Sequence, residues 1–67
     1  MQDRQAQIQE IIDFVRRHKN SYASQTVCSR VLGEDFMGIN DDTINELRAR
    51  LPEVDSEELE ACYYIIK

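Results

Sequence analysis

The apolar residues of this 67-residue chain recur at the spacing of an α-helix, which indicates a helical fold before any other feature is considered. Four of them form the first stripe, at i, i+3, i+4 and i+7: Ile8, Ile11, Ile12 and Val15. Asp3 precedes this stripe as a suitable N-cap, and the basic run at 16–19 suits the negative end of a helix dipole. Because Asn20 is a suitable C′ residue, the pattern predicts a helix over residues 4–19.

Three further segments show the same period. A second helix is predicted over 22–32, ending at Gly33, which tolerates the left-handed conformation of a helix stop. A third is predicted over 42–50, since Pro52 disfavours a helical conformation in the residue before it. A fourth is predicted over 56–66; its last turn has strong β-propensity, but no other segment offers a partner strand. The sequence therefore predicts an all-α fold, a small single-domain bundle of four short helices.

Two of these helix starts carry the sequence of a capping box, in which the N-cap and the residue three positions later bond each other's backbone. Asp55 with Glu58 opens the fourth helix in this way, and Thr43 with Glu46 fits the third. The N-cap candidates of the third helix are Asn40, Asp41 and Thr43. The sequence thus predicts both helix starts to within a few residues.

The size of the chain limits it to one small core. About 42% of the residues are hydrophobic, and a chain of this length buries roughly 60% of its unfolded surface. Three large apolar residues between the second and third helices are expected to complete that core: Phe36, Met37 and Ile39. Walls for a substrate pocket are hard to spare at this size, so catalysis is not expected.

The charge is strongly asymmetric along the chain. The formal net charge is −5, but residues 1–33 carry five bases and three acids, whereas residues 34–67 carry three bases and ten acids. The two halves are therefore +2 and −7. Such polarity gives the field of the molecule a direction and favours partners of opposite charge.

The residues that most often carry chemistry are too few and too scattered here. His18 is the only histidine and has no nucleophile beside it, and Cys28 and Cys62 lack the short paired spacing of zinc ligands. The acids around Gly38 do not follow the alternating spacing of a calcium loop. We expect no enzyme activity, no catalytic residue, no metal and no cofactor, and we expect both cysteines to be buried thiols.

The same composition bears on location. The longest uncharged apolar run, Ala61 to Ile66, is far shorter than the roughly 20 residues of a membrane span. The N-terminus does not resemble a secretory signal, and two cysteines do not make a disulfide framework. A cytoplasmic protein with reduced thiols and no membrane association is predicted.

The surplus of apolar side chains at the C-terminus suggests a protein-binding surface. Tyr64 and Ile65 lie outside the apolar stripe of the fourth helix, within a run of acids that includes Glu57 and Glu60. An aromatic anchor surrounded by charge is typical of an interface, and the charge would steer a basic partner. We therefore expect a small acidic adaptor or regulator that binds another protein. A homodimer through this surface and burial of the two apolar residues in the core are the alternatives.

A DNA-binding regulator is the alternative function. The basic cluster Arg16, Arg17 and Lys19, which Arg30 can join across the turn, would contact phosphates. The first three helices resemble, in layout, those of a winged-helix DNA-binding domain. Acids in the third helix oppose phosphate contact and no β-hairpin wing follows, so nucleic acid is the less favoured partner. A third hypothesis is an acidic decoy that occupies the nucleic-acid groove of another protein.

One short run resembles another family. Residues 47–59, with Leu51-Pro52 after a helix, are similar to the helix-loop-helix opening of CUE-type ubiquitin-binding domains. Leu51 stands in place of the usual aromatic residue, and the third helix with its di-leucine has no counterpart. The resemblance covers less than a third of the chain and implies a packing geometry, not a function.

Overall fold

The first helix, α1 (Arg4–Arg17), begins as the sequence predicts, because Asp3 accepts a hydrogen bond from the backbone N–H of Gln5 at 3.1 Å. It ends two residues earlier than predicted. His18 is the C-cap, and its N–H donates to the carbonyl of Phe14 at 2.9 Å. The N–H of Ser21 then donates to the His18 carbonyl at 3.1 Å, so the chain turns at once into the next helix.

This computed structural model describes residues 3–33 and 38–67. These ranges contain four α-helices and one 3-10 turn, joined by short connections, and no strand. The elements after α1 are α2 (Tyr22–Leu32), α3 (Asp41–Arg50), η1 (Leu51–Glu53) and α4 (Ser56–Ile66). The all-α prediction is confirmed, including a helix rather than a strand at the C-terminal end. Gly33 closes α2 with φ 88°, which explains why glycine stands there.

The start of α3 uses a different cap from the predicted box. The side chain of Asn40 accepts from the N–H of Thr43 at 3.0 Å, whereas the Thr43 hydroxyl donates to the carbonyl of Gly38 at 2.6 Å. The exposed Glu46 side chain lies 3.8 Å from Arg50 instead. The prediction of a Thr43–Glu46 capping box is therefore wrong, because Asn40 already accepts from the N–H of Thr43, which Glu46 would bond in such a box.

α3 ends at Arg50, as predicted, but not for the reason that the sequence indicated. Leu51 keeps the right-handed helical conformation (φ −55°, ψ −39°) although Pro52 follows it. Its side chain is fully buried, and burying a leucine stabilises by about 1.5–3 kcal/mol, enough to offset the preference imposed by proline. The chain continues as the η1 turn before α4 starts.

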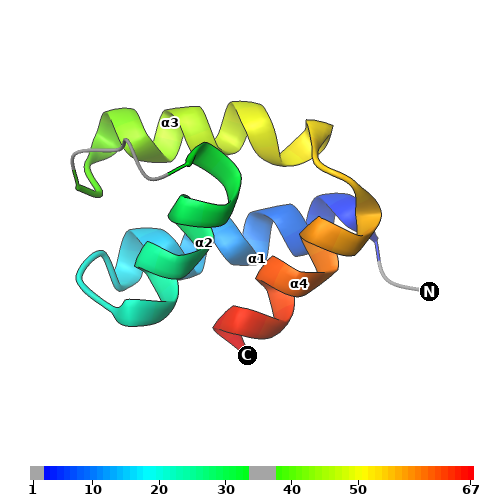
Figure 1. Cartoon of the computed structure of the whole chain (residues 1–67), viewed down its shortest axis with the longest axis horizontal. Coiled ribbons are helices and arrows are strands. Elements are labelled where there is room, and N and C mark those ends of the chain that lie inside the picture. The colour runs from blue at the N-terminus through cyan, green and yellow to red at the C-terminus, as the bar shows by residue number, and fades with distance from the viewer. Residues whose placement is uncertain (1–2, 34–37) are drawn as a thin grey trace.

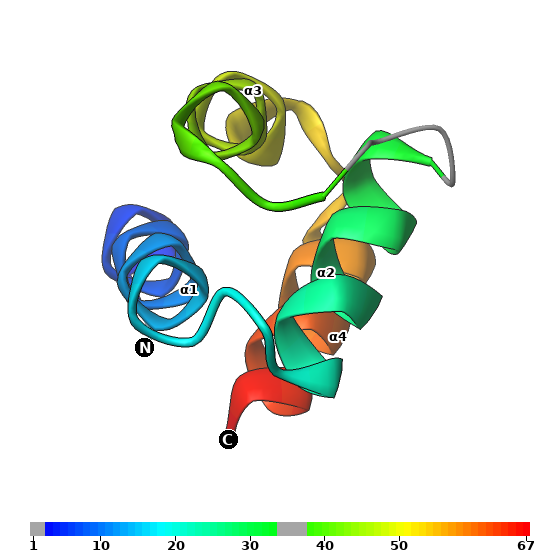
Figure 2. The same cartoon turned by 90° about the vertical axis from the view of Figure 1, so that its left-hand side faces the viewer.

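The helices pack in two antiparallel pairs. α2 and α4 lie side by side and run in opposite directions. α1 and α3 form the second pair, which also runs in opposite directions and crosses the first (Figures 1 and 2). The core lies between the pairs and contains the apolar stripes predicted from the sequence. Its fully buried or nearly buried members are Ile8, Ile11, Ile12, Val15, Val27, Cys28, Ile44, Leu47, Leu51, Leu59 and Cys62.

Two expectations about the segment before α3 have different outcomes. Ile39 is half-buried and packs against the core, as predicted. Phe36 and Met37 lie outside the described residues.

Arg4 joins the start of α1 to the junction between η1 and α4. Its Nη2 donates to the carbonyl oxygens of Pro52 at 3.0 Å and of Val54, and Nη1 lies 3.4 Å from the Ser56 hydroxyl. Carbonyls at a helix end have no partner within the helix, so a cation that reaches several of them stabilises the turn. This contact links the start of α1 to the junction before α4.

Candidate functional site

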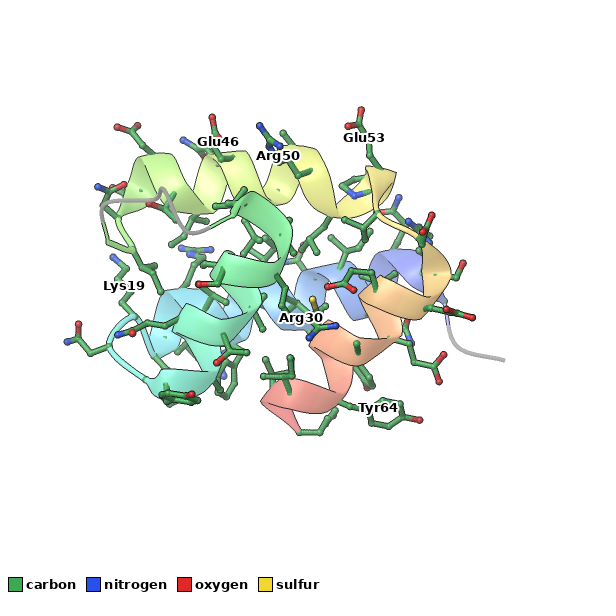
Figure 3. The ribbon with its side chains drawn as sticks, in the orientation of Figure 1. Lys19, Arg30, Glu46, Arg50, Glu53 and Tyr64 are labelled. Atoms are coloured by element: carbon green, nitrogen blue, oxygen red, sulfur yellow. The ribbon has the colours of Figure 1, made fainter. Side chains whose placement is uncertain are left out.

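The outward face of α4 carries three of the four predicted partner-binding residues. Glu57, Glu60 and Tyr64 follow at i, i+3 and i+7, so they share a stripe, and all three are exposed. Leu59 and Cys62 lie on the other side of the helix and are buried. Tyr64 is 67% exposed, and Figure 3 shows its ring pointing away from the bundle. We call these three residues the α4 face.

The fourth predicted residue, Ile65, has a different environment. It is half-buried and packs against the core cluster. One hundred degrees of helical rotation separate neighbouring residues, which is enough to place Tyr64 in solvent and Ile65 against the bundle. Of the two apolar residues, only Tyr64 is an exposed anchor.

The α4 face lies in the most acidic stretch of the chain. Glu53 and Asp55 are exposed just before it, and no Lys or Arg occurs between residues 51 and 66. Three cations lie near this stretch, and each has another partner. The guanidinium of Arg4 is bonded to backbone carbonyls, Arg30 is bonded to Glu58, and Lys67 is paired with Glu10. The acids therefore keep a negative field around Tyr64.

The acid of α4 that turns away from this face is Glu58. Its carboxylate accepts two hydrogen bonds from Arg30 of α2, at 2.8 and 3.1 Å. These bonds raise the pKa of Arg30 above its ordinary value. The predicted Asp55–Glu58 capping box is therefore not formed, and Asp55 caps α4 without a side-chain hydrogen bond.

The neighbouring Tyr63 is held in a polar network at the end of α4. The Tyr63 hydroxyl, and then the cation of Lys67, lower the pKa of Glu10. Lys67 Nζ lies 3.5 Å from Glu10 Oε1 and 5.1 Å from the centroid of the Tyr63 ring. Contact with Tyr63 and the charge of Glu10 raise the pKa of Lys67. Of these adjacent tyrosines, only Tyr64 is exposed.

The predicted basic residues do not form one surface. Arg16, Arg17 and Lys19 are exposed at the end of α1, but Arg30 lies between α2 and α4, bonded to Glu58 (Figure 3). Lys19 Nζ lies 4.0 Å from Asp41 Oδ1 at the start of α3. The four-residue nucleic-acid surface therefore loses Arg30.

An open pocket of about 380 Å³ lies between the end of α1 and the start of α3. Its lining residues are Asp13, Arg16, Arg17, Lys19, Asp41 and Ile44. This pocket was not predicted from the sequence. One local signal was present, because Asp13, Arg16 and Arg17 stand at i, i+3 and i+4 and therefore share a helix face.

The two cysteines are fully buried on the adjacent helices α2 and α4. Burial raises the pKa of the Cys28 thiol to about 11, and burial together with Glu58 does the same for Cys62. A thiol with so high a pKa is a poor nucleophile at neutral pH. His18 is exposed, and its ring lies 4.7 Å from that of Phe14.

Within residues 3–33 and 38–67, no three His, Cys, Asp or Glu side chains gather as metal ligands. None of the helices described is long and apolar enough to cross a membrane. Comparisons with protein-family models, curated proteins and solved structures gave no match to this chain.

Proposed function

We propose that this chain is a small, non-catalytic adaptor or regulator that binds another protein with a basic surface through the α4 face. The observation that carries the proposal is the exposure of Tyr64, 67%, within the most acidic part of the molecule. Tyrosine is enriched among the residues that dominate binding energy, because it buries a large area with few rotatable bonds. The two buried cysteines form no disulfide in the part of the chain described, which is in keeping with a cytoplasmic location.

Charge supports a basic partner over a second copy of the chain. In a two-fold symmetric dimer through the α4 face, the same patch of both copies would meet. Glu57 and Glu60 would then approach their own counterparts, and like charges at an interface are unfavourable. A partner rich in Lys and Arg would instead be attracted by these acids and by Glu53.

The nucleic-acid alternative has less support. The carboxylate of Glu58 neutralises Arg30, and the other three cations share their surface with Asp13 and Asp41. A long polyanion would therefore meet carboxylates as well as cations. We do not extend the proposal to DNA.

The test compares partners captured by the full chain and by three variants. Wild type and Tyr22→Ala should enrich the same protein, whereas Tyr64→Ala and the double variant Glu57→Gln/Glu60→Gln should lose it. Tyr22 is the matched control, because it is also an exposed tyrosine (86%) but lies on α2, away from the α4 face. The purified complex should then weaken as salt increases.

Two results would overturn this proposal. The first is an unchanged set of partners with Tyr64→Ala and with the double glutamine variant. The second is a wild-type chain that light scattering shows to be a dimer and that Tyr64→Ala converts to a monomer, since the α4 face would then be occupied by a second copy.

A further inference from the structure

The pocket between α1 and α3 has a chemistry unlike the rest of this acidic protein. Three of its lining side chains are cations and two are carboxylates, so the pocket carries a net charge of +1 within a chain of −5. We propose that it binds a compact phosphate group, as inorganic phosphate or on a small phosphate monoester, with Arg16 and Arg17 holding the phosphate oxygens.

The arginines favour an anionic ligand because neither has a carboxylate partner in the part of the chain described. The ion pairs found there involve Lys19, Arg30, Arg50 and Lys67. Both arginines line the pocket, and an anion bound there would reduce the repulsion between their like charges. The planar fork of donors on each arginine matches the oxygens of a phosphate.

The third cation is only loosely held. Lys19 Nζ and Asp41 Oδ1 are separated by 4.0 Å, and the side chain of Asp41 is 95% exposed. A contact of this kind contributes little to stability, so Lys19 can turn to a bound phosphate at small cost. Figure 3 shows Lys19 in the connection between α1 and α2, directed toward the start of α3.

The two carboxylates limit the size of the ligand. Asp13 accepts a hydrogen bond from the amide of Gln9 at 2.9 Å, and Asp41 is followed by the exposed Asp42. These acids would repel phosphates placed on either side of the first one. Ile44 supplies an apolar wall that suits the uncharged part of a monoester. One phosphate therefore fits better than the backbone of a nucleic acid.

The experiment follows the backbone amide signals of the full chain by NMR at constant ionic strength. Sodium phosphate, phenyl phosphate and a short DNA duplex are titrated separately. We expect saturable shifts at residues 13–19 and 41–44 with the first two. The double variant Arg16→Gln/Arg17→Gln should weaken this binding about tenfold or more, the effect of losing charge-assisted hydrogen bonds.

The matched control is Arg48→Gln/Arg50→Gln, which removes the same charge from exposed positions of α3 outside the pocket. We expect it to keep the wild-type affinity within about twofold, as for charges away from a site. Equal weakening in both double variants would overturn the proposal, as would shifts that do not saturate. If the duplex binds more tightly than the two phosphates, with a salt dependence that corresponds to several phosphate contacts, the pocket is part of a nucleic-acid surface instead. None of these variants alters the α4 face, so this test is independent of the proposed function.

Discussion

At the scale of the residue, the side chain of Arg4 makes contacts with residues that lie far from it along the sequence. It bonds the carbonyl of Pro52, 48 positions away, and thereby holds η1 and the start of α4 against α1. Local sequence patterns contain no trace of this contact, because helix caps and stripes concern residues three or four positions apart.

We expect Arg4→Ala to lower the free energy of unfolding by about 1–3 kcal/mol, because several carbonyls lose a charged donor. Urea denaturation followed by circular dichroism measures this change. The control is Arg48→Ala, an exposed arginine of α3, for which we expect a change within about 0.5 kcal/mol. Equal effects of the two variants would mean that the Arg4 contacts contribute nothing specific.

The sequence does not determine whether Tyr64 and Ile65 lie in the core or at the surface. Both lie outside the stripe of Leu59 and Cys62, so periodicity alone offers the same choice of core or surface for each. The choice is made by the packing of α4 against α1 and α2, which leaves Ile65 against the core and Tyr64 exposed. That information lies in the tertiary contacts.

At the scale of the element, helix starts could be predicted from the sequence because their signals are local. Three of the four N-cap side chains accept a hydrogen bond from a backbone N–H in the first turn of their helix: Asp3, Ser21 and Asn40. The fourth, Asp55, is at the predicted position but makes no such bond. The carboxylate of Glu58, the other member of its predicted box, pairs with Arg30, 28 positions away, instead of with the backbone N–H of Asp55. The positions of the caps could therefore be predicted from the sequence, but the pairing of Glu58 with Arg30 of another helix could not.

This difference between caps leads to a paired prediction. Asn40→Ala should lower the free energy of unfolding by about 1 kcal/mol, the usual cost of a lost N-cap bond. Asp55→Ala should lower it by less, since it removes only a charge near the helix dipole. Urea denaturation of both variants tests this order, and the reverse order would contradict it.

At the scale of the whole molecule, the two ends of the chain are tied to the bundle by polar contacts. Lys67 reaches Glu10 of α1, while Arg4 reaches the junction before α4. The molecule measures 34 Å along its longest axis, and Figure 3 shows Lys19 and Glu53 toward opposite ends of it. The two proposed binding sites are therefore well separated.

The Glu10 contact predicts how stability depends on pH. The pKa of Glu10 is lowered in the folded state by Tyr63 and then by Lys67, so ionised Glu10 stabilises the fold. This stability is present above the ordinary pKa of a glutamate and is lost as the pH falls through the lower folded value.

We therefore expect wild type to lose melting temperature more steeply than Glu10→Gln between about pH 5 and pH 2. Thermal unfolding by circular dichroism over this range measures the two slopes. Glu46→Gln, on the outer face of α3, is the control for loss of one negative charge. The same slope in Glu10→Gln as in wild type would count against the contact.

The exposure of Tyr64 also has an optical consequence. The chain contains three tyrosines and no tryptophan, so its intrinsic emission comes from phenol rings alone. Acrylamide in the solvent should quench Tyr22 and Tyr64 by collision more readily than the half-buried Tyr63. Binding at the α4 face would shield one of the two accessible rings, so a complex can be followed without any dye or tag on this protein.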